Sequence, residues 1–448
     1  MQFVIIGLAA IFGFLFGFDL GVIAGVLPLI TAEFALGSVR EGMVAAALPF
    51  GAILGVLTVT IAGDRYGRRT VLFASSLAFL LGTLAAALAP DVPVFLMARL
   101  VIGIAIGASA MVAPMYLAEI APARTRGAIV LAYQLMIVTG IFLAFVIDWG
   151  LSSFESWRLM IGVGIVPALM CFFGILIVPE SPRWLLMNGQ EAKARAVFRV
   201  VQPKIDAAEV ELIVQEAEAS LHTGPARGKW RDLLKPSVSG LAIFAAAAFF
   251  LQQFSGINAI LSFGPSILKS AGITGEANQL LVTIGVGFLN MAGSVVAISL
   301  VDRIGRRPLF IAGFLGTGIS MSFVAFSFLM PGFSSPLLVL VALFVFVMFF
   351  AVSLGTLPWV YMSELFPLPV RSLGMAIASL SNWSGDFIVM FLFPNLAASF
   401  GEAGAILFFA FWCVFGIWFA WKYAPETRGI ELEEVDDRIA GNPLQDIR

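Results

Sequence analysis

Long apolar segments recur along the chain, and charged residues, glycines and prolines separate them. A run of about 20 apolar residues is long enough to cross the hydrocarbon core of a bilayer as a helix. The pattern predicts six such helices, then a polar interval, then six more. Their expected bounds are 3–30, 42–62, 70–90, 93–118, 127–149, 158–178, 238–268, 277–300, 308–330, 336–361, 372–396 and 403–423. We therefore expect an all-α polytopic membrane protein with twelve transmembrane helices.

Basic residues are distributed unequally between the two sides that this pattern defines. If both termini are cytoplasmic, all but four of the 26 Lys and Arg residues fall on the cytoplasmic side; the four are Arg40, Arg99, Arg158 and Lys269. Cytoplasmic loops of membrane proteins carry such an excess. We expect a multi-pass protein of the cell membrane with both termini in the cytoplasm. The first apolar run begins at Phe3 without a basic leader, so we expect it to span the membrane rather than to be cleaved as a signal peptide.

The polar interval contains two amphipathic helical patterns joined at Pro203. We expect short cytoplasmic helices, and leave open whether they form a solvated linker or take part in gating. The only histidine, His222, lies in this interval, where it is poorly placed to carry protons across the bilayer. The expected domains are a six-helix bundle over 1–178, a cytoplasmic helical linker over 179–237, a second six-helix bundle over 238–424 and a cytoplasmic tail over 425–448.

Composition narrows the class of function. The chain is 60% hydrophobic and only 12% charged, whereas soluble globular domains carry about 25% charged residues. A net charge of -2 argues against a nucleic-acid partner. Cys171 and Cys413 lie far apart in apolar runs, so neither a disulfide framework nor a metal site is expected. We find no nucleophile–base set and no cofactor loop, so we expect neither an enzyme nor a cofactor.

Charged motifs reveal an internal repeat. The motif D-R-Y-G-R-R starts at Asp64 and D-R-I-G-R-R starts at Asp302, which is 302 − 64 = 238 residues later. Glu119 and Arg126 recur as Glu364 and Arg371 at an offset of 364 − 119 = 245, and P-E-S at 179–181 recurs as P-E-T at 425–427. The repeated unit spans six helices, an even number, so both copies enter the membrane in the same direction. This is the parallel-repeat arrangement of major facilitator transporters.

These repeated charges are expected at the cytoplasmic ends of helices. Ion pairs there, such as Glu119 with Arg126 and Glu180 with Arg183, could break and re-form when a cavity opens to that side. The alternative is that they only set topology and staple helix ends, although acidic residues contribute weakly to topology. The predicted gate residues are Asp64, Arg65, Arg69, Glu119, Arg126, Glu180, Arg183, Asp302, Arg303, Arg307, Glu364, Arg371 and Glu426.

A second class of polar residues lies deep in the predicted helices. Amides donate and accept hydrogen bonds, and a Trp face packs against the C–H side of a sugar ring, so this set suits a neutral, hydroxyl-rich ligand. The alternative is hydrogen bonding between helices. Ser255 and Gly256 could interrupt their helix and let its amides reach one cavity. The candidate substrate-binding residues are Gln134, Gln252, Gln253, Asn258, Asn290, Trp359, Asn382 and Trp383.

Asp19 is the only acidic residue before Glu33, and it lies within a stripe formed by Gly13, Gly17, Gly21 and Gly25. A charge at the membrane centre costs about 2.5 to 3.5 kcal/mol, so it needs a partner and indicates a function. Counting residues from the helix ends places Arg99 at a similar depth. An adjacent guanidinium favours an ionised carboxylate and desolvation favours the neutral acid, so protonation could be linked to pairing. The alternative is a purely structural pair.

The chain resembles the sugar porter branch of the major facilitator superfamily along nearly its whole length. The resemblance rests on G-D-R-Y-G-R-R at 63–69, E-x6-R at 119–126, P-E-S-P-R-W at 179–184, Q-Q-F-S-G-I-N at 252–258, D-R-I-G-R-R at 302–307 and P-E-T-R-G at 425–429. It implies that the gate residues form the intracellular gate, that the amides and tryptophans line the sugar site, and that an acid at Asp19 with Arg99 marks a proton symporter. Two departures leave the sugar and the outer gate open: Ser262 and Phe263 replace paired tyrosines, and 355–359 lacks the first proline of G-P-x-P-W.

We therefore expect a monomeric sugar:proton symporter, acting on a hexose or pentose by alternating access, whose partners are a small sugar, protons and the lipid bilayer. A facilitative uniporter with a structural Asp19 is the alternative, and a non-transporting sugar sensor is a remote one. Asp386 is another acid expected deep in a helix, and two alternatives stay open for it: a second protonatable site, or a side chain that faces an aqueous cavity.

Overall fold

The structure is a computed structural model, which describes residues 2–121, 126–201, 210–211, 214–215, 230–330, 335–366 and 370–426. Within them, eleven helices are long and apolar enough to span a membrane. The last of these, Leu373–Tyr423, contains two spans, because Gly401 has a φ of 72° and a ψ of 168° that interrupt the helix. The twelve predicted spans are therefore present.

The first half of the chain supplies six spans. They are α1 (Gln2–Glu33), α2 (Ser38–Tyr66), α3 (Arg68–Ala87), α4 (Val92–Ile120), α5 (Arg126–Leu151) and the pair α6 (Trp157–Val163) and α7 (Ile165–Ile177), with the short helix η2 (Ser152–Phe154) before α6. Local sequence explains several ends. Asp91 caps α4 by accepting the Val94 N–H at 2.9 Å. Gly67 separates α2 from α3 with a φ of 92°, which favours glycine.

The second half repeats this pattern. Its helices are η3 (Trp230–Leu234), α11 (Pro236–Phe254), α12 (Ile257–Ser270), α13 (Glu276–Ile304), α14 (Arg306–Leu329), α15 (Pro336–Phe349), η4 (Phe350–Leu354), α16 (Leu357–Leu365) and α17 (Arg371–Tyr423). Gly305, with a φ of 100°, separates α13 from α14 as Gly67 separates α2 from α3. The predicted interruption at Ser255 and Gly256 is confirmed, since Gly256 has a φ of 90° between α11 and α12.

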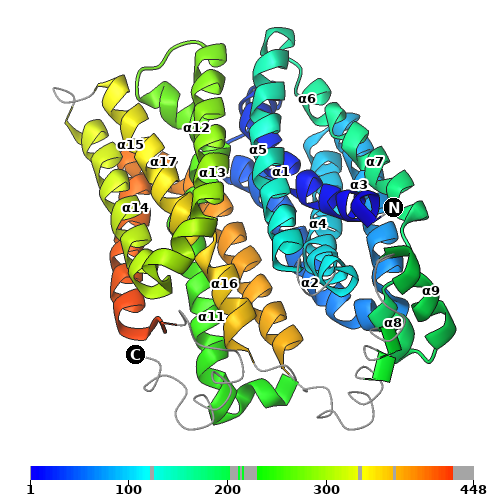
Figure 1. Cartoon of the computed structure of the whole chain (residues 1–448). Helices are drawn as coiled ribbons and strands as arrows, with labels where there is room; N and C mark the ends of the chain where they lie inside the picture. Colours follow the sequence, from blue (N-terminus) through cyan, green and yellow to red (C-terminus); the bar gives the residue numbers. More distant parts are fainter. Residues whose placement is uncertain are drawn as a thin grey trace.

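Two short helices, α8 (Pro182–Met187) and α9 (Glu191–Val201), follow the first half. Their side chains Leu185, Leu186, Ala194 and Phe198 form a small separate apolar cluster with Val210 and Val214. Arg195 of α9 bonds Glu211 at 2.5 Å, and this hydrogen bond lowers the pKa of the Glu211 carboxyl. We call the end of the bundle that carries α8 and α9 the linker end (bottom of Figure 1) and the opposite end the far end.

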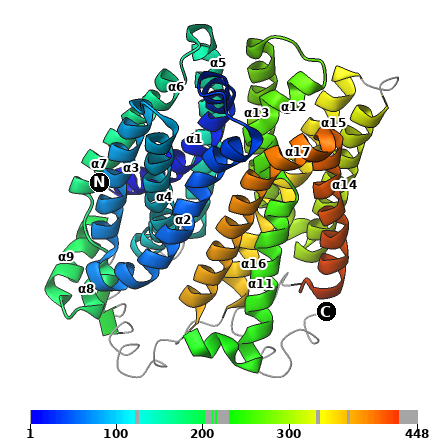
Figure 2. The same ribbon diagram turned by 180° about the vertical axis from the view of Figure 1, so that it is seen from behind.

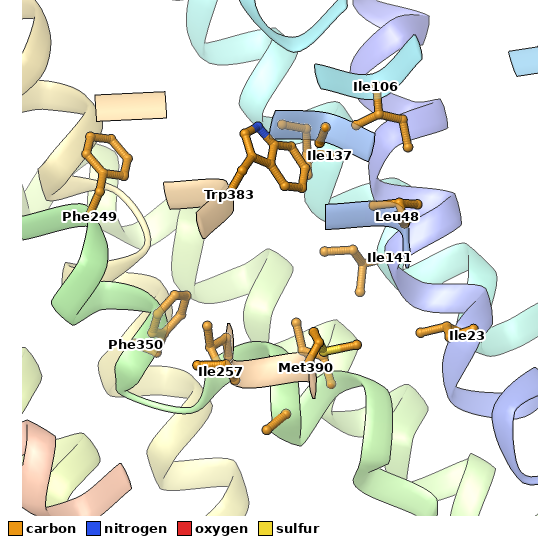
Figure 3. Packing of buried hydrophobic residues seen from close by; sticks show 14 of the residues in the cluster. Ile23, Leu48, Ile106, Ile137, Ile141, Phe249, Ile257, Phe350, Trp383 and Met390 are labelled. Carbon is orange, nitrogen blue, oxygen red and sulfur yellow. The ribbon is translucent and has the colours of Figure 1, made fainter. Parts of the chain in front are cut away.

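The two halves meet along α2 with α17 and along α5 with α13, and α1 also contacts α12. Figure 2 shows α2 and α17 side by side near the far end and separating toward the linker end. Apolar side chains from both halves form one continuous buried cluster. In Figure 3, Ile137 and Ile141 come from α5, whereas Trp383 and Met390 come from α17. The core therefore runs through both halves.

The glycine stripe of α1 packs against α5. A Cβ atom added at Gly13 would collide with the Tyr133 carbonyl oxygen, one at Gly17 with the Ile137 carbonyl oxygen, and one at Gly25 with the Asp148 carboxylate. The stripe therefore lets two helix backbones approach closely, as small residues do in membranes.

We expect Gly17→Ala to destabilise the protein by about 1 to 3 kcal/mol, because the added methyl group must push α1 away from α5. Thermal unfolding of the purified protein in detergent measures the loss. Gly7→Ala is the matched control, since an added Cβ at Gly7 meets nothing within 4 Å. Equal unfolding temperatures for the two variants would contradict the close packing.

Candidate functional site

Asp19 of α1 and Arg99 of α4 form a buried ion pair. Arg99 Nη1 donates to Asp19 Oδ2 at 2.5 Å, and the two side chains are only 3% and 5% exposed. The pairing expected from depth is therefore present. The Nε of Arg99 is buried and has no hydrogen-bond partner among the described atoms. The guanidinium is consequently held by one carboxylate, and loss of that contact would leave a buried charge without compensation.

A chain of side-chain hydrogen bonds links α11, α12 and α17. Gln253 Nε2 donates to Asn382 Oδ1 at 2.7 Å, and Asn258 Nδ2 donates to Gln253 Oε1 at 2.9 Å. The same Asn258 nitrogen donates to Asp386 Oδ1 at 2.8 Å. We call these four residues the amide network. The interruption at Gly256 makes it possible, because Gln253 lies before the break and Asn258 after it.

The other predicted substrate residues lie on neighbouring helices. Gln252 Nε2 donates to the Leu354 carbonyl oxygen of η4 at 2.8 Å, and its buried Oε1 has no partner among the described atoms. Gln252 therefore offers a free acceptor. Asn290 of α13 is buried, and Gln134 of α5 is partly buried. Within the described residues, no side-chain hydrogen bond joins these two to the amide network.

The two tryptophans have different surroundings. Trp359 of α16 packs edge-on against Phe249, with ring centroids 4.8 Å apart. Trp383 of α17 packs against Phe16 of α1, with ring centroids 5.2 Å apart. It therefore joins the two halves at the level of the amide network. Aromatic rings combined with a few polar side chains are typical of sites for small molecules.

At the linker end, two glutamates cap helices of the repeat in the same way. Glu180 accepts the backbone N–H groups of Arg68 and Arg69 at 2.9 and 3.0 Å, at the start of α3. Glu426 accepts those of Arg306 and Arg307 at 3.0 and 3.1 Å, at the start of α14. Each carboxylate thus satisfies unpaired amides at the positive end of a helix dipole.

Glu119 pairs with Arg68, a residue that the sequence motif contained but that we did not single out. Arg68 Nη2 lies 3.1 Å from Glu119 Oε1, with both side chains largely buried. The Arg69 and Arg307 guanidinium groups donate instead to backbone carbonyl oxygens, of Leu176 at 2.8 Å and of Trp421 at 2.5 Å. The pairs at this end therefore follow from which helix ends meet, and not from spacing along the chain.

The remaining predicted gate residues are exposed, make a single contact, or have side chains outside the described residues. Arg183 is exposed, while Glu180 bonds the backbone amides described above. Arg303 is exposed, Arg65 lies over the Tyr66 ring at 5.3 Å, and Asp302 pairs with Arg306 at 3.1 Å. The side chains of Asp64, Arg126, Glu364 and Arg371 lie outside the described residues.

A pair of tyrosines shows a signal that sequence reasoning missed. The Tyr116 hydroxyl donates to the Pro179 carbonyl oxygen at 2.8 Å, and the Tyr361 hydroxyl donates to that of Pro425 at 3.0 Å. The tyrosines are 361 − 116 = 245 residues apart and the prolines 425 − 179 = 246, the offsets of the repeat. Comparing tyrosines between the two halves would have revealed them.

The side-chain contacts between the halves lie in the middle and toward the far end of the bundle, within the described residues. Phe50 packs against Phe387 with ring centroids 5.5 Å apart, and Phe142 packs against Phe288 with ring centroids 6.2 Å apart. The backbone at Gly42, near the start of α2, closely approaches Phe391. Together with the separation of α2 from α17 in Figure 2, this places the closed side of the structure at the far end.

The chain is similar to known proteins along nearly its whole length. Residues 5–438 match the family described as "Sugar (and other) transporter". The D-xylose transporter of Levilactobacillus brevis is 34% identical, with 98% of this chain and 95% of that protein covered. The galactose-proton symporter of Escherichia coli is 33% identical, with 100% and 96% covered. The partially occluded inward open structure of the E. coli xylose transporter XylE superposes with a TM-score of 0.84 at 28% identity, covering 96% of this chain and 99% of that one.

Proposed function

Because this chain belongs to the sugar (and other) transporter family, we propose that it is a symporter that carries one sugar together with protons by alternating access. The observation that carries this proposal is the buried Asp19–Arg99 pair, which lies in the first half while the amide network lies in the second. The pair holds a proton-sensitive charge, and the network offers hydrogen bonds to hydroxyl groups.

Protonation of Asp19 would release Arg99 and change the contact between α1 and α4. Alternating access needs two states that differ in such contacts, and a ligand shifts their populations by its preference for one of them. The proton is that ligand at Asp19. Because Trp383 contacts Phe16, which is one turn before Asp19 on α1, a change at the pair can reach the sugar site through one aromatic contact.

The sugar site in this proposal lies between the halves. Support comes from the unsatisfied Oε1 of Gln252, the amide network and the two tryptophans. The proposed substrate-binding set is the one expected from sequence, namely Gln134, Gln252, Gln253, Asn258, Asn290, Trp359, Asn382 and Trp383.

The predicted gate residues are proposed to form the gate at the linker end, with Arg68 added as the partner of Glu119. The excess of basic residues supports assigning the linker end to the cytoplasm, with both termini on that side of the cell membrane. The structure would then be the state that is closed outside. We also propose that the protein is a monomer and that its domains have the bounds expected from the sequence, 1–178, 179–237, 238–424 and 425–448.

Counterflow in proteoliposomes tests the substrate class. Vesicles loaded with unlabelled D-xylose, D-galactose, D-glucose or myo-inositol should take up the same labelled compound for at least one of these sugars. A pH-sensitive dye then separates symport from uniport, since sugar addition should carry protons into the vesicles. Absence of counterflow for all four would refute sugar transport, and sugar entry without proton entry would favour the uniporter.

Gln253→Ala should weaken sugar binding by about tenfold, the effect of losing one hydrogen bond of about 1.4 kcal/mol. It removes the centre of the amide network, which joins Asn258 to Asn382. Gln279→Ala is the matched control: Gln279 is also buried, but it donates to the Ile273 carbonyl oxygen at 2.8 Å, away from the network. Binding measured by Trp fluorescence should be normal in the control, and equal losses in both variants would contradict the assignment.

A further inference from the structure

Asp386 is a buried acid that the proposed coupling mechanism does not use. It lies on α17, one turn beyond Asn382 and Trp383, and is 1% exposed. Its Oδ1 accepts a hydrogen bond from Asn258 Nδ2 at 2.8 Å. The same amide nitrogen bonds Gln253, so Asp386 is the terminal member of the amide network. An acid therefore lies within the group of side chains that is proposed to hold the sugar.

No cation neutralises this acid within the described residues. Asp19 has Arg99, but no ion pair of the described residues involves Asp386. The helix α11 contains no ionisable residue, and the only one on α12 is Lys269, eleven residues beyond Asn258 or about 16 Å along the helix axis. The charged residues of the other elements around α17 lie near helix ends: Arg40, Glu41, Asp64 and Arg65 on α2, Arg306 and Arg307 on α14, Glu364 on α16, and Arg231 and Asp232 on η3.

Asp19, on the facing helix α1, is the nearest acid in depth. Asp19 follows Phe16 by three residues and Asp386 follows Trp383 by three, and the Phe16 and Trp383 rings pack against each other, so the two acids lie at similar levels. Asp19 is bonded to Arg99 on α4, however, and Asp386 to Asn258 on α12. Each acid therefore contacts partners of its own half of the molecule.

We propose that Asp386 is a second protonation site, which sets the affinity for sugar, and that sugar binds to the form in which its carboxyl is protonated. This inference rests on the proposed function. A protonated carboxyl keeps one oxygen to accept from Asn258 and gains an O–H that can donate to a sugar hydroxyl oxygen. The proton comes from the solution on the side where sugar binds and returns to solution when sugar leaves.

Magnitudes favour the protonated form. A carboxylate could also accept bonds from sugar hydroxyls, each worth about 1.5 to 3 kcal/mol net. Bound sugar, however, would keep Asp386 away from water, and an uncompensated charge at the membrane centre costs about 2.5 to 3.5 kcal/mol. This cost is comparable with the gain from one such bond, and the protonated carboxyl forms a hydrogen bond to sugar without that cost. Sugar binding should therefore draw a proton onto Asp386.

This arrangement gives the two acids different roles. Asp386 raises sugar affinity where the solution is acidic and lowers it where the solution is alkaline, by linkage between proton and sugar binding. Asp19, through its pair with Arg99, governs which forms of the carrier switch between states. A proton gradient across the membrane would therefore favour sugar capture on its acidic side and sugar release on its alkaline side.

Sugar binding as a function of pH tests the proposal, with Asp19→Asn as the parent so that its own titration is removed. D-xylose and D-galactose are the probes, and the dissociation constant is measured in detergent from pH 5 to pH 9. The parent should bind more weakly as pH rises, approaching about tenfold per pH unit, the limit for one linked proton. Asp386→Asn added to this parent keeps an acceptor for Asn258 but cannot titrate, so its affinity should change less than about twofold over this range.

Asp148→Asn is the matched control. Asp148 is also fully buried, and its Oδ2 accepts the Gly25 N–H at 3.1 Å, but it belongs to the contact between α1 and α5 and not to the amide network. The control should keep the full dependence on pH. A parent with constant affinity, a parent that binds more tightly at high pH, or an Asp386→Asn variant that follows the parent would each overturn the proposal.

Proton uptake gives a second measurement that does not depend on the folding of Asp386→Asn. Sugar added to the unbuffered parent protein with a pH dye should remove protons from solution at alkaline pH. No uptake would overturn the role of Asp386. Failure of the proposed function looks different, because wild-type protein would then show neither binding nor counterflow of the sugars tested.

Discussion

Asp19→Asn abolishes uphill accumulation of sugar in proteoliposomes while counterflow continues; this is the largest effect that we expect. Asn keeps an oxygen that can accept from Arg99 Nη1, so the contact between α1 and α4 is preserved. It cannot take up or release a proton, so the pair no longer responds to the proton gradient. Asp386 does not replace it, because in our proposal it sets affinity and does not restrict switching.

The measurement compares sugar inside and outside vesicles under an imposed pH gradient. One pH unit is worth 1.36 kcal/mol per proton, so under a gradient of one pH unit wild-type protein should approach about tenfold accumulation for each proton carried with the sugar. The variant should approach a ratio of one. Glu33→Gln is the control on the same helix: Glu33 pairs with Arg158 at 2.9 Å, but both side chains are about 40% exposed, and such pairs contribute little. If Asp19→Asn accumulates sugar as well as wild type does, Asp19 does not couple sugar transport to protons.

The second large effect that we expect is a loss of folding stability in the Arg99→Met variant. Removing the guanidinium leaves Asp19 buried without its cation, and breaking one side of a buried pair costs about 3 to 5 kcal/mol. Met has a similar volume and flexibility, so it leaves little void. Thermal unfolding should show a large loss at neutral pH. The loss should shrink as pH falls, because protonation neutralises the orphaned carboxyl in the folded protein.

The double variant Asp19→Asn with Arg99→Met separates charge from packing. Both side chains are then neutral, so most of the lost stability should return and the two effects should not add. Additive losses would indicate that Arg99 acts through packing rather than through the pair.

Much of the fold could be predicted because hydropathy is a property of single segments. The fourth helix, expected over 93–118, is Val92–Ile120, and the predicted interruption at Gly256 is present. The resemblance to sugar porters is confirmed by the family match over residues 5–438. Arg99 was found as the partner of Asp19 because depth follows from counting residues along two helices of known direction.

Lateral contacts could not be predicted in the same way. The bond from Arg68 to Glu119 was not predicted, and Glu180 bonds the backbone at the start of α3 and not Arg183 as expected. The expected pair of Glu119 with Arg126 stays a prediction, because the Arg126 side chain lies outside the described residues. The sequence places the acid Asp386 deep in a helix, but nothing in it shows that Asn258 donates a hydrogen bond to Asp386. These contacts depend on how each helix is rotated and on which helix ends adjoin.

The sequence by itself determined the twelve spans, the repeat, the depth of Asp19 and the residue types available for a sugar site. The length of an apolar segment and the depth of a residue within it depend only on the order of residues along the chain, so both can be read from the sequence. The tertiary structure alone decided that the glycine stripe faces α5, that Asp386 ends the amide network with no ion-pair partner among the described residues, and that the halves meet in the middle and toward the far end. The physical reason is that hydrogen bonds and ion pairs act over a few ångströms, so they depend on neighbours that only packing brings together.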